Sequence, residues 1–102
     1  MTIREIKELQ EQYGVDYYQD LIDTGMAWKM EGSIGRKCMS YLSSGVCFLP
    51  LKSHYDYWGN EVPSRNKVAN GTMGSLSLSK EFWSDESKYD MFFDLQAELY
   101  NE

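Results

Sequence analysis

Residues 33–50, Ser-Ile-Gly-Arg-Lys-Cys-Met-Ser-Tyr-Leu-Ser-Ser-Gly-Val-Cys-Phe-Leu-Pro, contain the change of pattern that decides the fold. Apolar side chains first recur at helical intervals along one face, at Ile34, Cys38, Tyr41 and Leu42. Ser33 can cap this predicted helix, and Gly45 ends it. Residues 46–49 then predict a short buried strand or extended segment, which Pro50 stops.

Two more helices are predicted before this stretch. Thr2 begins a capping-box pattern, and apolar residues follow at helical intervals until Gly14 ends the first helix. Asp16 can cap a second helix, which Gly25 ends. Residues 26–30 are largely apolar but few, so they either extend the second helix or form a turn.

The C-terminal half predicts a long loop followed by one helix. Residues 50–83 are rich in Gly, Asn, Ser and Pro and have no sustained helical period, but their aromatic residues favour ordered packing. Leu76 and Leu78 alternate with serines as in a short strand. Ser84 can cap an amphipathic last helix over about residues 85–101.

The composition indicates one small globular domain spanning residues 1–102. A hydrophobic fraction of 42% suffices for a single modest core and argues against general disorder. No apolar run approaches the roughly eighteen residues that span a membrane, and the N-terminus lacks a secretory signal pattern. We therefore expect a mainly helical α+β domain with a short β element and a long ordered loop, located in the cytoplasm.

The net charge of −6 is concentrated at the C-terminal end of the chain. Residues 81–102 contain seven acidic residues against the single base Lys88, whereas acids and bases balance over residues 1–80. Such a segment attracts a basic protein surface and repels a phosphate backbone. The charge pattern thus predicts a protein partner with a basic surface, with no direct binding to nucleic acid and none to a membrane.

Acidic residues recur at every fourth position of the predicted last helix, with two apolar residues beside them. This stripe is either a solvated face or an imitation of a phosphate ladder that occupies a nucleic-acid groove on a basic partner. Adjacent apolar side chains suit a protein contact better than solvation alone. With two aromatic residues of the loop, the predicted partner-binding residues are Glu86, Asp90, Asp94, Glu98, Met91, Leu95, Tyr57 and Trp58.

The cysteines and the single histidine of the chain lie close together in sequence. Cys38, Cys47 and His54, completed by Asp56, have the residue types of a structural zinc site, which would stabilise a small core. Their spacing matches no standard zinc finger, and in the alternative both cysteines are core residues and His54 is a hydrogen-bonded loop residue. A disulfide is less expected than free thiols in a reducing compartment.

No catalytic motif is recognisable in the chain. It has one histidine and no serine in a nucleophile-elbow context, so it offers no readable triad. We expect a protein that is not an enzyme. A metal-dependent hydrolase using the predicted zinc ligands is the weakest of the alternatives.

Four segments carry a resemblance to a known family: residues 27–36 (Ala-Trp-Lys-Met-Glu-Gly-Ser-Ile-Gly-Arg), 45–49 (Gly-Val-Cys-Phe-Leu), 54–65 (His-Tyr-Asp-Tyr-Trp-Gly-Asn-Glu-Val-Pro-Ser-Arg) and 71–75 (Gly-Thr-Met-Gly-Ser). Residues 16–75 resemble a family of small proteins encoded by phages and mobile elements. Cys47, His54 and Asp56 match the pattern of that family, whereas Cys38 stands where a small apolar residue is common.

The resemblance implies a phage setting rather than an activity. Small acidic phage-borne proteins often act against host defence, and some are anti-CRISPR inhibitors of the nuclease Cas9. We therefore expect a non-enzymatic inhibitor in the host-cell cytoplasm that binds a nucleic-acid-handling defence protein, most specifically type II-A Cas9, through its acidic surface. The alternative is a zinc-stabilised regulatory or structural module that binds another phage protein.

Overall fold

Helices form most of the computed structural model, which describes the backbone of residues 1–100 and the side chains of residues 1–96. The five α-helices of this part are α1 (Ile3–Gln12), α2 (Asp16–Thr24), α3 (Gly32–Ser44), α4 (Leu76–Trp83) and α5 (Glu86–Tyr100). The shorter elements are the 3-10 helices η1 (Met26–Trp28) and η2 (Arg65–Lys67) and the antiparallel strands β1 (His54–Tyr55) and β2 (Glu61–Val62). The mainly helical α+β prediction is confirmed. Over residues 1–100, no helix combines the length and hydrophobicity needed to cross a membrane.

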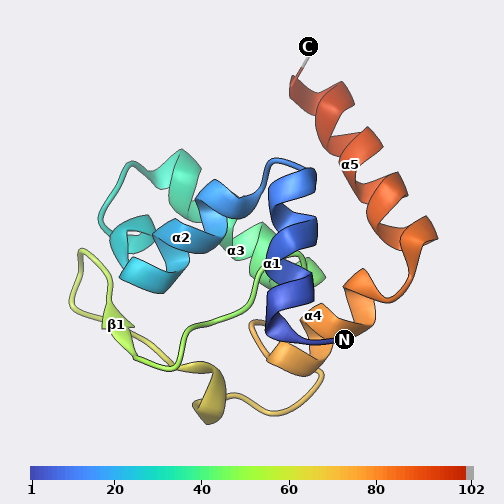
Figure 1. The fold of residues 1–102 in the computed structure, drawn as a ribbon. Helices are drawn as coiled ribbons and strands as arrows, with labels where there is room; N and C mark the ends of the chain where they lie inside the picture. Colours follow the sequence, from blue (N-terminus) through green and yellow to red (C-terminus); the bar gives the residue numbers. More distant parts are fainter. Residues whose placement is uncertain (101–102) are drawn as a thin grey trace.

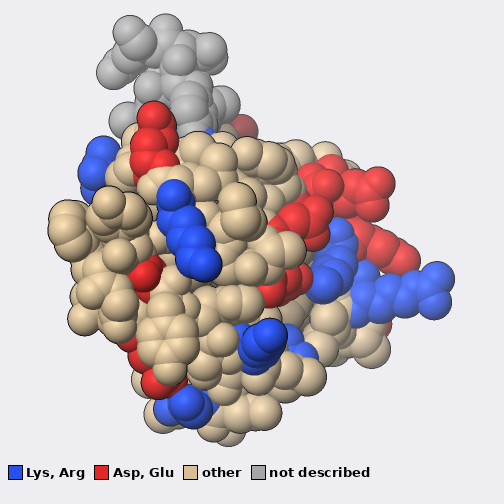
Figure 2. Space-filling view, turned by 90° about the vertical axis from the view of Figure 1, so that its left-hand side faces the viewer, with Lys and Arg blue, Asp and Glu red and all other residues tan. Residues whose placement is uncertain are grey.

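The β-hairpin and α5 lie on opposite sides of the molecule (Figure 1). α1, α2 and α3 pack in the middle, α4 lies below them, and α5 leads up and away from the body (Figure 1). Figure 2 looks onto the hairpin side, where the surface is mostly uncharged, basic side chains are scattered over it, and acidic side chains are most numerous towards the right-hand edge, next to basic ones. The fold thus separates the hairpin from the acidic last helix.

The first helix begins as predicted, and the next two begin slightly differently. The Thr2 hydroxyl accepts the Glu5 N–H at 3.2 Å, and the Glu5 carboxylate accepts the Thr2 N–H at 3.3 Å, which completes the capping box. Asp16 is the first residue of α2 rather than its cap. Ser33 does not cap α3, because the helix already starts at Gly32 and the Ser33 hydroxyl donates to the carboxylate of Glu31, the residue before the helix.

The predicted strand at Leu76 and Leu78 is wrong, because both residues belong to α4. The hydroxyl of Ser75 accepts the Leu78 N–H at 3.2 Å and caps this helix. A serine cap followed by one turn of alternating leucines looks like a short strand in sequence, but the cap stabilises helical dihedral angles instead. The loop is therefore shorter than predicted, and it contains the hairpin.

The predicted cap of the last helix is wrong by one residue. Ser84 lies at the C-terminal end of α4, whereas the Asp85 carboxylate accepts the Ser87 N–H at 3.1 Å at the start of α5. A carboxylate suits this position better than a hydroxyl, since the helix dipole favours negative charge there. Glu98 belongs to α5, but its side chain lies outside the described residues.

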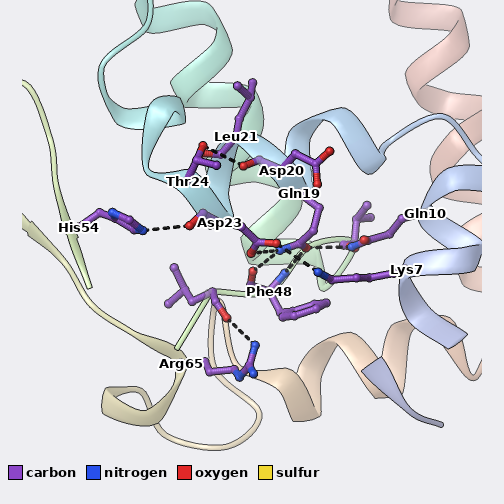
Figure 3. A network of polar contacts seen from close by, with 12 residues as sticks. Lys7, Gln10, Gln19, Asp20, Leu21, Asp23, Thr24, Phe48, His54 and Arg65 are labelled. Atoms are coloured by element: carbon purple, nitrogen blue, oxygen red, sulfur yellow. Dashed lines mark hydrogen bonds and ion pairs between the residues drawn. The ribbon is translucent and has the colours of Figure 1, made fainter. Parts of the chain in front are cut away.

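Residues 46–49 are buried as predicted but form no strand, since residues 46 and 47 bend and residues 48 and 49 have no regular structure. Two buried glutamines bind the backbone of this segment (Figure 3). Gln19 Nε2 donates to the Phe48 carbonyl oxygen at 2.9 Å, and Gln19 Oε1 accepts the Phe48 N–H at 3.1 Å. Gln10 Nε2 donates to the Val46 carbonyl oxygen at 2.8 Å and to Gln19 Oε1 at 2.9 Å. The pair thus supplies the hydrogen bonds that a neighbouring strand would otherwise provide.

Other elements form hydrogen bonds with the remaining backbone groups of this segment. The Cys47 N–H donates to the Tyr41 carbonyl oxygen of α3 at 3.0 Å, and the indole N–H of Trp83 in α4 donates to the Val46 carbonyl oxygen at 3.0 Å. The guanidinium of Arg65 donates to the Leu49 carbonyl oxygen at 3.3 Å, which fixes the loop after the hairpin. The buried segment is therefore the part of the core on which α1, α2, α3 and α4 converge.

An aromatic cluster and one polar bond attach α5 to this core. The ring of Tyr13 stacks on Phe93 with centroids 4.6 Å apart and also contacts Trp83 and Tyr89. The Tyr13 hydroxyl donates to the Asp90 carboxylate at 2.8 Å, and this bond, aided by desolvation, raises the pKa of Tyr13 to about 12. Asp90 is therefore an exposed acid with a structural contact.

Replacing Gln19→Leu tests the role of the glutamine pair. The substitution leaves both backbone groups of Phe48 without their side-chain partner, so we expect the free energy of unfolding to fall by about 2–4 kcal/mol. The control Gln12→Leu changes an exposed glutamine of α1 and should stay within about 0.5 kcal/mol of the wild type. Chemical denaturation measures both values, and equal losses in the two variants would contradict the assignment.

Alkaline titration tests the bond between Tyr13 and Asp90. Because the pKa of Tyr13 rises from about 10 in the unfolded chain to about 12 in the folded one, the bond stabilises the fold fully below pH 10 and is lost as the pH rises through 12. The stability difference between the wild type and Tyr13→Phe should therefore shrink over this range. The exposed Tyr17→Phe is the control, and a pH-independent difference for Tyr13→Phe would rule out the bond.

Candidate functional site

An apolar groove of about 820 Å³ lies between η1, the first turns of α3, the β-hairpin and the loop before α4. Its volume is in the range of ligand-binding clefts. Its most prominent side chains are methionine and aromatic: Met30, Met39, Met73, Trp28, Tyr57 and Trp58. Leu42 and Leu49, which are buried in the core, also line it. The groove thus rests on the core and opens to solvent through its methionine and aromatic side chains.

The hairpin turn holds two aromatic residues in the open. One oxygen of the Asp56 carboxylate accepts the N–H groups of Trp58 at 2.9 Å and Asn60 at 2.8 Å. The Tyr57 N–H donates to the Trp28 carbonyl oxygen at 3.1 Å, which ties the turn to η1. Tyr57 and Trp58 remain 77% and 81% exposed although their backbone is fixed. Aromatic residues presented in this way are typical of binding surfaces, and partner binding by this pair stays a prediction.

The charged residues of the groove are not equally available. Glu61 pairs with Lys67 at 2.7 Å, and this hydrogen bond lowers the pKa of the Glu61 carboxyl. The carboxylate of Asp56 is occupied within its turn. Arg36 forms no ion pair with any described side chain, and the indole N–H of Trp28 is buried without an acceptor in that part of the chain. The groups left open are thus hydrogen-bond donors.

The four predicted zinc ligands do not form a set in the structure. Cys38 and Cys47 are completely buried core residues, and desolvation raises the pKa of Cys38 to about 11 and that of Cys47 well above its usual value. This disfavours the thiolate, the form that binds zinc. Within residues 1–96, no three His, Cys, Asp or Glu side chains are grouped to hold a metal ion.

His54 and Asp56 have local partners of their own. His54 Nε2 donates to the Asp23 carbonyl oxygen at 3.0 Å (Figure 3), and the ring lies so close to Gly25 that an added Cβ would be 2.5 Å from Nδ1. Asp56 binds the backbone of the hairpin turn. Zinc binding by this set stays a prediction.

The acidic face of α5 is present at the surface. Glu86, Asp90 and Asp94 are exposed, and Met91 and Leu95 are 72% and 55% exposed. Asp90 differs from its neighbours because it accepts the Tyr13 hydroxyl. We call the described residues Glu86, Asp90, Met91, Asp94 and Leu95 the acidic face. None of them lines the groove, so the molecule has two separate candidate surfaces.

Of the residues that line the groove, the sequence singled out Tyr57 and Trp58 as predicted partner contacts and Asp56 as a predicted zinc ligand. Met30, Met39 and Met73 carry no common spacing, and no sequence pattern singled out Arg36. The available signal was compositional, since the chain has six methionines and flexible methionines are frequent at adaptable binding surfaces.

Comparison with known proteins gives a family. No curated protein and no solved structure matches this chain. A family model matches residues 3–56, which is more than half of the chain. This span runs from α1 through the buried segment to Asp56, and it ends before α4 and α5. The chain therefore belongs to the family described as Domain of unknown function (DUF7417).

Proposed function

We propose that this protein is a non-enzymatic interaction module that binds a partner protein through its apolar groove. The observation that carries the proposal is the lining of the groove by partly exposed methionines around a rigid pair of aromatic residues. Polarizable, flexible methionines adapt to a partner side chain, and fixed aromatics supply contact area at low entropic cost. Such a surface fits a desolvated anchor better than it fits a reaction centre.

The polar chemistry of the groove supports binding over catalysis. Among its charged residues, Glu61 is paired with Lys67 and Asp56 is used by the hairpin turn. A general base needs a free acceptor within reach of a substrate proton. The groups without a partner among the described residues, the exposed Arg36 guanidinium and the buried Trp28 indole N–H, are hydrogen-bond donors instead.

The acidic face supplies a second contact, for a basic surface of the partner. Its carboxylates would steer association and set orientation, and Met91 and Leu95 would provide the apolar contact that charge alone does not give. The most specific form of this proposal is inhibition of a nucleic-acid-handling host defence protein such as Cas9. Its support is the acidic face together with the resemblance of residues 16–75 to small phage-encoded proteins.

The groove is tested by placing a charge in it. Met39→Lys keeps a long side chain on α3 but adds an ammonium group to the groove, so we expect it to weaken partner binding at least tenfold. Met26→Lys changes a methionine that is 50% exposed outside the groove and is the control. Binding is measured with the immobilised protein and its partner from host lysate, then with purified Cas9. Equal binding by both variants would rule out the groove.

The acidic face is tested by charge reversal at Glu86 and Asp94, leaving Asp90 intact because it holds Tyr13. The double variant Glu86→Lys/Asp94→Lys should slow association with Cas9 at least tenfold at low salt, and the difference should shrink at high salt. Glu11→Lys/Asp20→Lys changes the net charge equally on exposed positions of α1 and α2.

Three results would decide against this mechanism. Equal slowing by both double variants would show that net charge alone matters. No change in either variant would remove the acidic face from the contact. Absence of Cas9 binding at every salt concentration would refute Cas9 as the partner, whereas the groove variants would still test the more general proposal.

A further inference from the structure

We propose that the occupant of the groove is a protein segment in which a carboxylate lies next to a bulky apolar side chain, with the carboxylate bound by Arg36. The inference rests on the proposed function and names the chemistry of the partner at that same site. We infer this chemistry from the hydrogen-bonding groups of the groove that have no partner among the described residues, and from the position of the excess negative charge along the chain.

Two side-chain groups of the groove have no partner among the described residues, and both are hydrogen-bond donors. The guanidinium of Arg36 has no ion pair within the described side chains, and the Trp28 indole N–H is buried without an acceptor there. The two acidic lining residues are already engaged, Glu61 by Lys67 and Asp56 by its own turn. A carboxylate offers two acceptor oxygens to these donors and forms strong bonds with a guanidinium.

The position of Arg36 suits this role. It lies on the first turns of α3, together with Gly32 and Gly35 in the groove wall. A Cβ added to Gly32 would be 2.9 Å from Arg36 Nη1, so the glycine leaves room for the guanidinium across the start of the helix. The positive end of the helix dipole adds to its charge. The nearby carboxylate of Glu31 accepts the Ser33 hydroxyl and forms no ion pair with Arg36.

The excess negative charge of the protein does not oppose an acidic segment at this place. Acids and bases balance over residues 1–80, and the surplus lies on residues 81–102. α5 and the hairpin lie on opposite sides of a molecule whose longer axes measure 37 and 33 Å (Figure 1). Charges so far apart are screened at physiological ionic strength, where the Debye length is about 8 Å.

The shape of the groove favours a protein segment over a free fatty acid. Met30, Met39 and Met73 are 36–43% exposed, so the groove stays open along its methionine wall and would leave much of an acyl chain in water. Beside it, Tyr57 and Trp58 extend the apolar surface outward, where the backbone and flanking residues of a peptide can pack. The occupant we expect inserts one large side chain and places a neighbouring Asp or Glu on Arg36.

The test uses the full chain, immobilised, and a random library of 12-residue peptides displayed on phage particles. We expect enrichment of sequences with Asp or Glu within two positions of Leu, Met, Phe or Trp. In titrations with synthetic peptides, changing that acid to its amide should weaken binding at least tenfold. Arg36→Met should cause the same loss, whereas Arg4→Met, which removes an exposed arginine of α1, should cause none.

Other outcomes would overturn the proposal. Enrichment of neutral or basic peptides that still require Met39 would refute the carboxylate but leave the groove as a binding site. Binding of laurate that depends on Arg36, without enriched peptides, would assign the groove to a fatty acid. Self-association abolished by Arg36→Met would assign it to a second copy. If no peptide is enriched and Met39→Lys leaves partner capture intact, both this inference and the proposed function fail.

Discussion

Two buried glutamines, Gln10 on α1 and Gln19 on α2, hold the backbone of the buried segment that follows α3. A buried peptide group without a partner is costly, and no strand within residues 1–100 pairs with this segment, so its bonds come from side chains and from the backbone of Tyr41 and Gly74. The same Val46 carbonyl oxygen also accepts the indole N–H of Trp83, which brings α4 to the core. The glutamine pair therefore fixes the relative placement of helices that are distant in sequence.

This arrangement of the core also forms the floor of the groove. Leu49 ends the bonded segment and Leu42 lies on the buried face of α3, and both line the groove. Above this floor the walls combine two kinds of parts. The hairpin turn is rigid, because Asp56 binds its backbone and the Tyr57 N–H reaches η1. The methionines are flexible, so the site pairs a fixed aromatic platform with an adaptable apolar wall.

Local signals predicted much of the fold, and tertiary constraints account for what they missed. The capping box at Thr2 and the glycines that end helices act within a few residues, so they can be recognised in sequence. Gln10 and Gln19 look like surface residues, since only their long-range bonds to residues 46–48 explain their burial. α4 was missed because its cap, Ser75, stands in a serine-rich stretch that also fits a short strand.

The candidate site was predictable to a similar degree. Tyr57 and Trp58 stand in a turn-forming sequence, so their exposure could be expected. A hydrogen-bonded His54 was the alternative to zinc binding, but its partner, the Asp23 carbonyl, could not be predicted, because it follows from how the hairpin docks. The same holds for the bonds of Asp56 to the backbone of the turn. The groove joins residues from four segments of the chain. That its unpartnered side-chain groups are donors follows only once it is known that Glu61 pairs with Lys67 and that Asp56 binds the backbone of its own turn.

The three indole N–H groups provide the most direct test of binding through the groove. Trp28 and Trp58 line it, whereas Trp83 is bonded to Val46 in the core. In a nitrogen–proton correlation spectrum of the labelled protein, addition of the partner should shift the indole signals of Trp28 and Trp58 and leave that of Trp83 in place. A bound complex in which the signals of Trp28 and Trp58 do not move would contradict the account.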